Sequence, residues 1–475
     1  MRRCLAMLAG LALAGVAQAA QAPFPAAAPD TPISSRDRVY AAEQFSNTVS
    51  VTDPSTNRLL GVIRLGDPQP ANFSPLYRGQ VLVHGMGFAP DGRTIAVVSI
   101  GSNGVSFIDT ATNAVKHTTY VGRSPHEAFY TPDGREVWVT VRGEDYIAVL
   151  DATTFAEVAR VRTPNGPGMT IFSPDGRYAY VCSSFTPTLV VFDVASRAEA
   201  GRVAQPSPFC PNIAATPDGK QVWYTLKDIG KTVVIDAAPP FATLATLDTG
   251  PITNHVNFVD TARGRFAYVT VGGLNEVQVF DRWRFTKVVT IPVGSLPHGI
   301  WPSGDGTRVY VGLEGGDELV AIDTRTNNVV ARVPIGQGAQ ALNYVPGAVP
   351  VGDGTAGLQP LGLAGNAFHL AMGPPGQDGA APTTVALYDQ GLVQVLEAAV
   401  TELAPRANYV LGFRDAAGAF EPLASFTTNP AGAAIVNATG QIRQIVRDGG
   451  TTRRWLEIVV QGSDSPAQAV QVQRP

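Results

Sequence analysis

The sequence predicts an all-β protein in which a seven-bladed β-propeller is followed by a small antiparallel β-sandwich-like domain. Two observations indicate the propeller. A turn glycine recurs at a spacing of 42 to 45 residues, and a strand-ending aspartate recurs at the same spacing after one longer first step from Asp53 to Asp109. A third observation indicates the second domain, because this rhythm stops after Pro346 while strand-like apolar runs continue. A chain of 475 residues is long enough for more than one domain.

The repeating unit is clearest in residues 126–165, which read as four short strands. These expected strands are Glu127–Thr131, Glu136–Val141, Tyr146–Asp151 and Ala156–Arg162. The first two are separated by Pro-Asp-Gly, a tight-turn signal. The second strand is β-branched and aromatic and mostly apolar on both faces, which is typical of a strand covered on both sides. One such unit cannot bury two faces alone, so it needs neighbours of the same kind.

Two anchor positions carry the repeat along the chain. The turn glycines, at steps of 42, 42, 43, 45 and 42 residues, are Gly92, Gly134, Gly176, Gly219, Gly264 and Gly306. The aspartates that close the third strands are Asp53, Asp109, Asp151, Asp193, Asp236, Asp281 and Asp323. Seven aspartates in units of four strands predict seven blades over residues 38–347.

The two ends of the repeat array complement each other. The N-terminal end supplies strands two to four of a blade at Val39–Gln44, Thr48–Asp53 and Leu59–Leu65. The C-terminal end supplies a single first strand, Ala341–Val345. Pairing these segments in one composite blade closes the ring and leaves no open sheet edge.

Several segments resemble the YVTN-type β-propeller repeat of bacterial and archaeal envelope proteins. The matching segments are Ile108–Asn113, Tyr180-Val181, Tyr268-Val269-Thr270, Pro297-His298-Gly299-Ile300, Tyr310-Val311 and Ile322–Asn327. The resemblance implies the fold. It does not imply one activity, because such repeats occur in surface proteins, lactonase-like proteins and metalloenzyme propellers. The fifth unit departs from the pattern, since Asp260–Gly264 replaces the Pro-Asp-Gly turn.

The first 19 residues are expected to be a signal peptide. Arg2 and Arg3 precede the apolar run Leu5–Val16, which is too short to span a bilayer, and Ala17-Gln18-Ala19 has the small-x-small cleavage pattern. We therefore expect export to the periplasm or the cell exterior. Residues 20–37, rich in Pro and Ala, are expected to form a disordered arm. No second long apolar run follows, so we expect no transmembrane anchor.

The rest of the chain adds an insertion, a linker and the second domain. Gly66–Gln80 lengthens one connection and is expected to lie over one face of the ring, either as a binding loop or as a packed flap. Residues 348–360 read as a Gly/Pro-rich linker, and residues 361–475 hold seven or eight strand-like runs of the sandwich-like domain. The net charge of −4, without a basic run, argues against nucleic-acid binding.

Four of the six histidines share one register of the repeat. His84, His126 and His298 lie eight residues before the turn glycine, and His255 lies nine before it. Gln340 is the equivalent residue of the composite blade. This position opens the innermost strand at the channel mouth, where converging imidazoles can bind a ligand, act as acid or base, or hold a divalent metal such as zinc or copper. Alternatively, each histidine packs separately between two blades.

A second ring of candidates follows the second strands, which end at the same face. Arg142, Lys227 and Glu314 occupy this position. Asn254 and Asn257 are expected near them, because they lie on either side of His255 in the sequence. Together they predict a polar face of mixed charge. Ordinary solvated loop charges are the alternative explanation for the same residues.

The motifs exclude some functions and leave two open. The chain has no Cys-x-x-Cys-His haem site, Gly-x-Ser-x-Gly elbow, phosphate-cradling Gly loop or His-Glu-x-x-His motif. The first hypothesis is a non-enzymatic exported protein that binds a small molecule or a protein partner on the histidine face. The second is a lactonase-like or metal-assisted hydrolase acting at that face. The sequence shows no recognisable pair of a nucleophile and a base, so the binding hypothesis is preferred.

Cys182 and Cys210 are expected to form a disulfide. They are the only cysteines beyond the signal peptide, and an exported chain meets an oxidising compartment. Cys182 ends the second strand of one blade and Cys210 begins the next blade, so both lie at the histidine face. A buried free thiol at Cys182 is the alternative.

Overall fold

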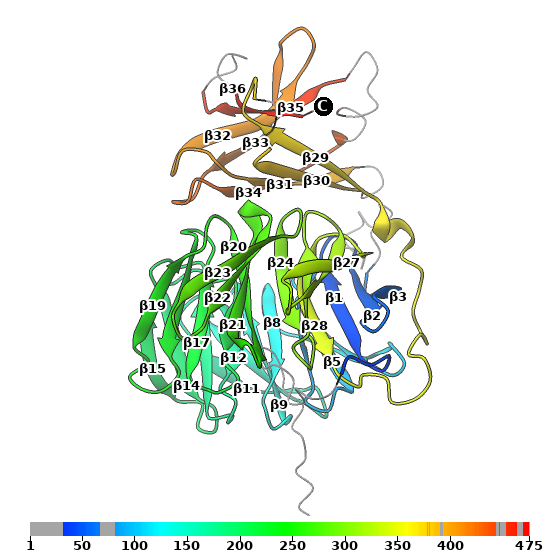
Figure 1. Ribbon diagram of the computed structural model, residues 1–475, viewed down its shortest axis with the longest axis vertical. Helices are drawn as coiled ribbons and strands as arrows, with labels where there is room; N and C mark the ends of the chain where they lie inside the picture. Colours follow the sequence, from blue (N-terminus) through cyan, green and yellow to red (C-terminus); the bar gives the residue numbers. More distant parts are fainter. Residues whose placement is uncertain are drawn as a thin grey trace, which may run out of the picture.

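The computed structural model describes residues 32–66, 81–377, 379, 381–389, 393–442, 446, 453–462 and 469–474. Seven four-stranded antiparallel sheets form a ring around a central channel, and one eight-stranded sheet lies on an end of the ring (Figure 1). The predicted fold class, a seven-bladed propeller followed by a small antiparallel β domain, is confirmed. Among the described residues, no helix has the length and apolar character needed to cross a membrane.

The blades are numbered I to VII along the ring. Blades I to III contain β4 (Val83–Phe88), β5 (Thr94–Ser99), β6 (Gly104–Asp109), β7 (Val115–Tyr120), β8 (Pro125–Tyr130), β9 (Glu136–Val141), β10 (Tyr146–Asp151), β11 (Glu157–Arg162), β12 (Pro167–Phe172), β13 (Tyr178–Ser183), β14 (Thr188–Asp193) and β15 (Glu199–Ala204). Blades IV to VI contain β16 (Ile213–Ala215), β17 (Gln221–Leu226), β18 (Lys231–Asp236), β19 (Thr243–Asp248), β20 (Thr253–Thr261), β21 (Gly264–Val271), β22 (Glu276–Asp281), β23 (Thr286–Pro292), β24 (Pro297–Pro302), β25 (Arg308–Leu313), β26 (Glu318–Asp323) and β27 (Asn328–Pro334). The short 3-10 helix η2 (Gly272–Leu274) follows β21.

Blade VII is the predicted composite blade. Its strands are β28 (Ala339–Val345), β1 (Arg38–Glu43), β2 (Thr48–Asp53) and β3 (Arg58–Arg64). β28 pairs antiparallel with β1, with Tyr40 opposite Asn343. The prediction that the two ends of the array close the ring is therefore confirmed. The core lies between the blades, because the innermost strands are buried along their whole length while the outermost strands such as β7 are mostly exposed.

The two sequence anchors have local structural causes. Gly134 has φ of +72°, which a glycine adopts without strain, and Thr131 Oγ1 donates to Asp133 Oδ1 across the same turn at 2.6 Å. Asp151 accepts backbone N–H groups two and three residues ahead, as Asx turns do. In blade V this turn is replaced by a tight hairpin between Thr261 and Gly264, as the sequence indicated.

The C-terminal domain is called the cap here because of where it lies. Its strands are β29 (Ala367–Gly373), β30 (Thr383–Asp389), β31 (Gln394–Val400), β32 (Asn408–Arg414), β33 (Phe420–Thr427), β34 (Ala434–Gly440), β35 (Trp455–Val460) and β36 (Ala469–Gln473). They form one antiparallel sheet in the order β33-β32-β35-β36-β29-β30-β31-β34, and the two edge strands contact each other. The cap is thus a single, nearly closed sheet around its own apolar core, rather than two separate sheets.

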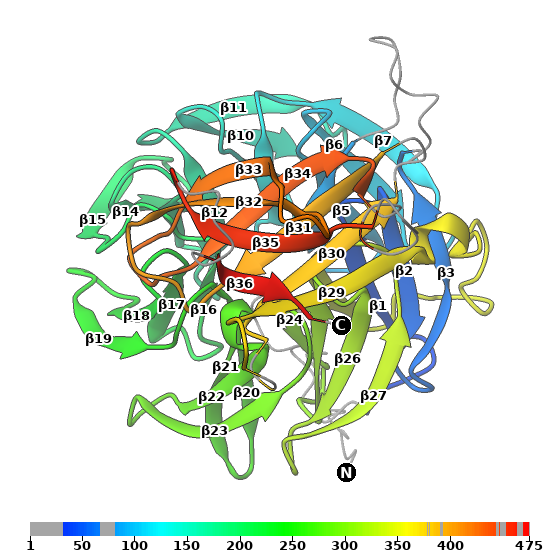
Figure 2. The ribbon, with the colours of Figure 1, turned by 90° about the horizontal axis from the view of Figure 1, so that it is seen from above.

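The cap covers the end of the propeller at which the innermost strands begin (Figure 2). Ile252 and Leu296 of the ring share a buried apolar cluster with Ala399 and Ala433 of the cap. Tyr388 stacks on Phe45 with ring centroids 4.4 Å apart. The interface combines these buried apolar contacts with hydrogen bonds, such as the one that Ala431 N donates to Asp228 O, so the cap packs directly on the ring.

Residues 348–360, called the strap here, connect the ring to the cap. They leave β28, run along the flank of the propeller to η3 (Gly362–Gly365) and are fastened on the way (Figure 1). Gln359 exchanges two backbone hydrogen bonds with Val62 of β3, and Asn113 Nδ2 donates to Gly354 O at 3.0 Å.

Arg36 and Asp37 lie in the segment expected to be a disordered arm. Arg36 Nη1 donates to Val349 O at 3.1 Å, and Asp37 Oδ1 accepts from Gly347 N at 2.7 Å. The expectation of disorder is therefore wrong for these residues, because bonds to the strap region fix them. The expected signal peptide, the rest of the arm up to residue 31, and the insertion from residue 67 to residue 80 lie outside the described residues.

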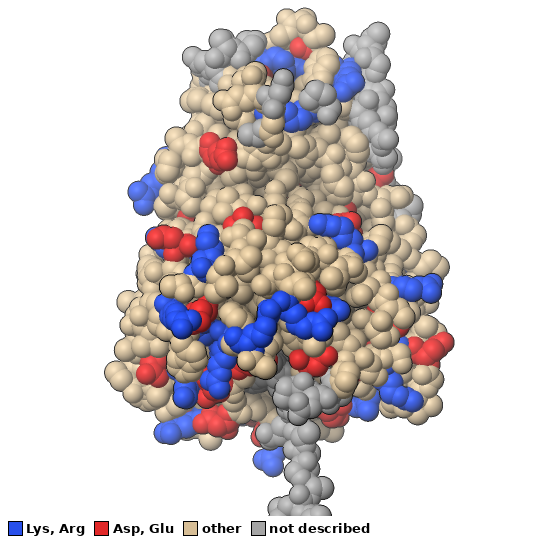
Figure 3. All heavy atoms as spheres, viewed as in Figure 1, with Lys and Arg blue, Asp and Glu red and all other residues tan. Residues whose placement is uncertain are grey.

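The flank of the molecule carries charges of both signs. Lys and Arg side chains alternate with Asp and Glu over the propeller face seen in Figure 3, without a large patch of one sign. Arg202 with Glu199 and Arg332 with Glu318 are examples of exposed pairs on outer strands. Such pairs contribute little to stability because water screens them.

Candidate functional site

The histidines stand where the innermost strands depart from regular pairing. The register with the second strand shifts between Val83 and Met86 in blade I and between Pro297 and Ile300 in blade VI. Blades II and V show the same irregularity around His126 and His255. Bulges of this kind redirect side chains and are common next to functional sites. Glycine permits the local crowding, because a Cβ on Gly299 would lie 2.8 Å from the Gln340 carbonyl oxygen.

The structure brings the four predicted histidines into one row. The ring centroids of His84 and His126 are 4.5 Å apart, those of His84 and His298 are 6.5 Å apart, and those of His255 and His298 are 4.8 Å apart. All four side chains are buried. The four imidazoles therefore lie next to one another in the channel and are not isolated in separate blade interfaces.

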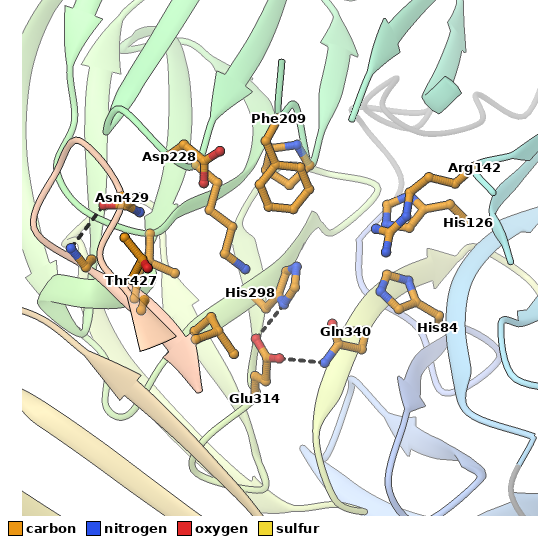
Figure 4. Close-up of a pocket in the computed structure, with 16 residues that line it drawn as sticks. His84, His126, Arg142, Phe209, Asp228, His298, Glu314, Gln340, Thr427 and Asn429 are labelled. Carbon is orange, nitrogen blue, oxygen red and sulfur yellow. Dashed lines mark hydrogen bonds and ion pairs between the residues drawn. The ribbon is translucent and has the colours of Figure 1, made fainter. Parts of the chain in front are cut away.

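A cavity of about 400 Å³, called the chamber here, lies between this row and the cap (Figure 4). Its lining comes from the mouth of the ring and from the cap: His84, His126, Arg142, Phe209, Pro211, Lys227, Asp228, Ile252, His298, Glu314, Gln340, Thr427, Asn429, Ala433, Ala434 and Ile435. This size is within the range of small-molecule sites. Seven of the predicted site residues line it.

Glu314 organises the centre of the chamber. Its Oε2 accepts from His298 Nδ1 at 2.7 Å, and its Oε1 accepts from Gln340 Nε2 at 2.8 Å (Figure 4). Burial would raise the pKa of the Glu314 carboxyl, but His298, Lys227 and the two hydrogen bonds outweigh it and lower the pKa to about 2. Burial lowers the pKa of His298 against the pull of that carboxylate. Glu314 is thus ionised and His298 neutral, with its proton on Nδ1.

His126 is held in the same tautomer by the backbone. Its Nδ1 lies 2.7 Å from Gly168 O, and because a carbonyl oxygen only accepts, Nδ1 carries the proton. Burial and the nearby Arg142 hold the pKa values of His84 and His126 well below the usual range, so both are neutral. Nδ1 of His84 is buried without a hydrogen-bond partner among the described residues.

Two cations line the chamber without a partner. Neither Arg142 nor Lys227 makes a side-chain hydrogen bond or ion pair within the described part of the chain, although both are half-buried. Burial lowers the pKa of Arg142, and Glu127 opposes the shift. Charged groups that are withdrawn from water normally acquire a counter-charge.

Three predicted residues do not line the chamber. His255 and Asn257 face a smaller space in the channel beneath it, and the Asn257 amide bonds to Ile300 O. Asn254 points between blades V and VI, where its Nδ2 donates to Pro297 O at 2.8 Å. Glu127 borders the same lower space, and burial raises its pKa to about 8. The predicted polar face is therefore divided into two levels.

The predicted disulfide between Cys182 and Cys210 is confirmed, with Cα atoms 6.0 Å apart. The disulfide joins β13 to the segment that precedes β16. Strand β16 itself is only three residues long. Phe209 and Pro211 flank Cys210 and line the chamber. Gly168 occupies the histidine register of blade III because a Cβ there would lie 2.9 Å from Cys210 O.

The cap residues of the chamber could not be found from the sequence. Thr427, Asn429 and Ala433–Ile435 come from the end of β33, the start of β34 and the turn between them. Tyr388 Oη donates to Glu314 O at 2.6 Å. Glu397 of β31 shares a hydrogen bond with Glu314, and burial together with that neighbour raises the pKa of Glu397 well above its usual range. The sequence Asn-Pro-Ala-Gly at residues 429–432 indicates a turn, but nothing in the sequence indicates that this turn contacts the propeller.

Metal binding gains no geometric support from the described residues. Among them, no three His, Cys, Asp or Glu side chains are placed to hold one metal ion. The histidine row is extended, and Glu314 already uses both carboxylate oxygens. The arrangement suits hydrogen bonding to a polar molecule.

Comparisons with known proteins agree on the fold. A family model described as YNCE-like beta-propeller matches residues 93–346. A functionally unknown protein from Desulfotomaculum acetoxidans DSM 771 has 15% identity and a TM-score of 0.55, with 65% of this chain and 98% of that chain covered. At that identity the likeness shows the fold alone. No curated protein matches the chain.

Two further solved structures are similar at lower scores. Kuenenia stuttgartiensis Hydrazine Synthase has 20% identity and a TM-score of 0.49, with 54% of this chain and 87% of that chain covered. Dihydro-heme d1 dehydrogenase NirN in complex with DHE has 14% identity and a TM-score of 0.49, with 90% of this chain and 80% of that chain covered.

Proposed function

This chain belongs to the YNCE-like β-propeller family, and we propose that it is an exported, non-enzymatic binding protein that holds a small molecule in the chamber. The chamber carries the proposal, because it combines a volume of about 400 Å³ between the ring and the cap with polar groups that have no hydrogen-bond partner within the described part of the chain. Arg142, Lys227 and Nδ1 of His84 are such groups among the described residues. Unpaired polar groups in a buried site are compensated when a ligand supplies the missing partners.

A small molecule fits better than a protein partner. The histidine face would suit a protein if it were open, but the chain's own cap lies over it and is joined to the ring through buried residues such as Ile252 and Ala433. Export is supported by the N-terminal targeting pattern and by the Cys182–Cys210 disulfide, which oxidising compartments favour.

A screen by thermal shift tests the proposal. The purified protein is mixed with organic acids, amino acids, sugars and nucleosides, and at least one class is expected to raise the melting temperature. Ala434→Phe should abolish that shift, because Ala434 lines the chamber and the added ring occupies it. Ala416→Trp, in an exposed turn of the cap, is the control and should keep it. A shift that survives Ala434→Phe, or no shift with any compound, would contradict the proposal.

A lactonase-like hydrolase is the second candidate, favoured by the pair of His298 and Glu314. A carboxylate that fixes an imidazole tautomer leaves Nε2 able to take a proton from water. The described residues that line the chamber include neither Ser nor Cys, and the nucleophile that this pair would activate is water. Hydrolysis of a lactone or ester panel that is lost in His298→Gln would favour this candidate over simple binding.

A further inference from the structure

The polar groups of the chamber that have no hydrogen-bond partner among the described residues differ in the ligand group that each would bind. We propose that the ligand is a small organic acid that also carries a hydroxyl or amino group near its carboxylate. This inference rests on the binding function proposed above and specifies its ligand class. It follows from three features of the chamber: two free cations, two imidazole acceptors and an apolar wall.

The cations call for an anionic group on the ligand. Arg142 lies beside His84 and His126 on one side of the chamber, and its guanidinium has no acceptor among the described residues (Figure 4). Lys227 is equally without an ion-pair partner there. A guanidinium matches a carboxylate through two parallel hydrogen bonds.

The acids of the chamber do not satisfy both cations. Both oxygens of Glu314 are engaged by His298 and Gln340. Asp228 lies on the other side, near Asn429, and is the remaining acid among the lining residues (Figure 4). The two carboxylates match the two cations in number, but neither forms an ion pair with Arg142 or Lys227 among the described residues, so each cation can still pair with an anionic group of the ligand.

The imidazoles call for a hydrogen-bond donor on the same ligand. His126 gives its Nδ1 proton to Gly168 O, and His298 gives its Nδ1 proton to Glu314. In a neutral imidazole the other nitrogen is then an acceptor, so Nε2 of each ring presents a lone pair. Neither Nε2 has a partner within the described residues. A bare anion would leave both acceptors unused, whereas a hydroxyl or ammonium group would fill one.

The carbon skeleton of the ligand has a place of its own. Phe209, Ile252 and Ile435 contribute apolar surface to the chamber. Burial of the ligand's apolar carbons against this wall favours binding in proportion to the area covered. The ligand class is therefore a hydroxy or amino acid with an apolar side group.

Three probe molecules of similar shape test separately whether the ligand needs a carboxylate and whether it needs a hydrogen-bond donor. Mandelate carries a carboxylate, a hydroxyl and a phenyl ring; phenylacetate lacks the hydroxyl, and mandelamide lacks the charge. Titration calorimetry on the oxidised full-length protein should show mandelate binding about tenfold more tightly than either analogue. Arg142→Gln should reduce mandelate to the affinity of mandelamide, and His298→Phe should reduce it to that of phenylacetate. Arg135→Gln, at an exposed arginine outside the chamber, should change nothing.

The outcomes distinguish this inference from the proposed function. Mandelamide binding as tightly as mandelate overturns the anionic part, and phenylacetate binding as tightly overturns the donor part. In both cases the chamber still binds a small molecule. If none of the three binds at about 10 mM, the inference is overturned, and the thermal-shift screen decides the rest. If compounds without an acidic group raise the melting temperature, the proposed binding function still holds. If no compound does, both the binding function and the ligand class are refuted.

Discussion

Glu127→Gln should make the protein less sensitive to rising pH. Glu127 lies on β8 below the histidine row, and burial raises its pKa from the ordinary 4.5 to about 8, while a backbone bond from Met86 and the charge of Arg142 oppose the shift. Between pH 4.5 and about pH 8, the Glu127 carboxyl therefore stays protonated in the folded state and loses its proton in the unfolded state. Stability from this carboxyl is complete below pH 4.5 and is lost as pH rises towards 8.

The magnitude follows from the same linkage. Each pH unit in that window costs about 1.4 kcal/mol of unfolding free energy, so the group removes about 3 kcal/mol between pH 5 and pH 7. The amide introduced by Glu127→Gln would not ionise, and it keeps an oxygen that can accept from Met86. The free energy of unfolding in urea, measured at both pH values for both proteins, should therefore show a difference between variant and wild type that grows by about 3 kcal/mol.

A control variant isolates the effect. Glu157→Gln removes an exposed carboxyl from β11 of the same blade and should leave the pH dependence of the wild type in place. A difference between Glu127→Gln and wild type that is the same at pH 5 and pH 7 would refute the reasoning. The carboxyl would then be solvated or paired in solution.

Three further outcomes are expected. Replacing both Cys182 and Cys210 by Ser should lower the free energy of unfolding by about 3 kcal/mol, because the disulfide closes a loop across 28 residues, and alkylation of the denatured, unreduced mature protein should find no free thiol. Deleting residues 20–50, or ending the chain after Val330, should abolish cooperative unfolding of the ring in calorimetry, because each deletion removes strands from blade VII; an unchanged transition would speak against the closure. Elemental analysis of purified protein should find less than one equivalent of zinc or copper, because the described residues hold no suitable group of ligands, and one full equivalent would contradict this.

Local physical chemistry made much of the ring predictable from sequence. The Asp151 and Gly134 anchors recur because each fixes a turn, one through side-chain acceptance of backbone N–H groups and the other through positive φ. The shared register of His84, His126 and His298 followed from the same repeat. The disulfide followed from Cys182 and Cys210 lying at the same face of neighbouring blades, which repeat arithmetic specifies.

The remainder depends on contacts that the repeat does not encode. His255 faces the smaller space beneath the chamber, and the amide of Asn254 is used between two blades, so neither lines the chamber. The position of the cap depends on apolar residues such as Ile252 and Ala433, which look like ordinary core residues in the sequence. Export and localisation stay predictions, since residues 1–31 lie outside the described chain.

The strap bears on how a ligand exchanges. A tethered lid swings open when its linker is loose, but residues 348–360 are bonded to blade VII at Val62 and to blade I at Asn113. Lifting the cap would break these bonds as well as the buried interface. A ligand would therefore enter and leave through the openings that the chamber has between the cap and the blades, while the cap itself stays in place.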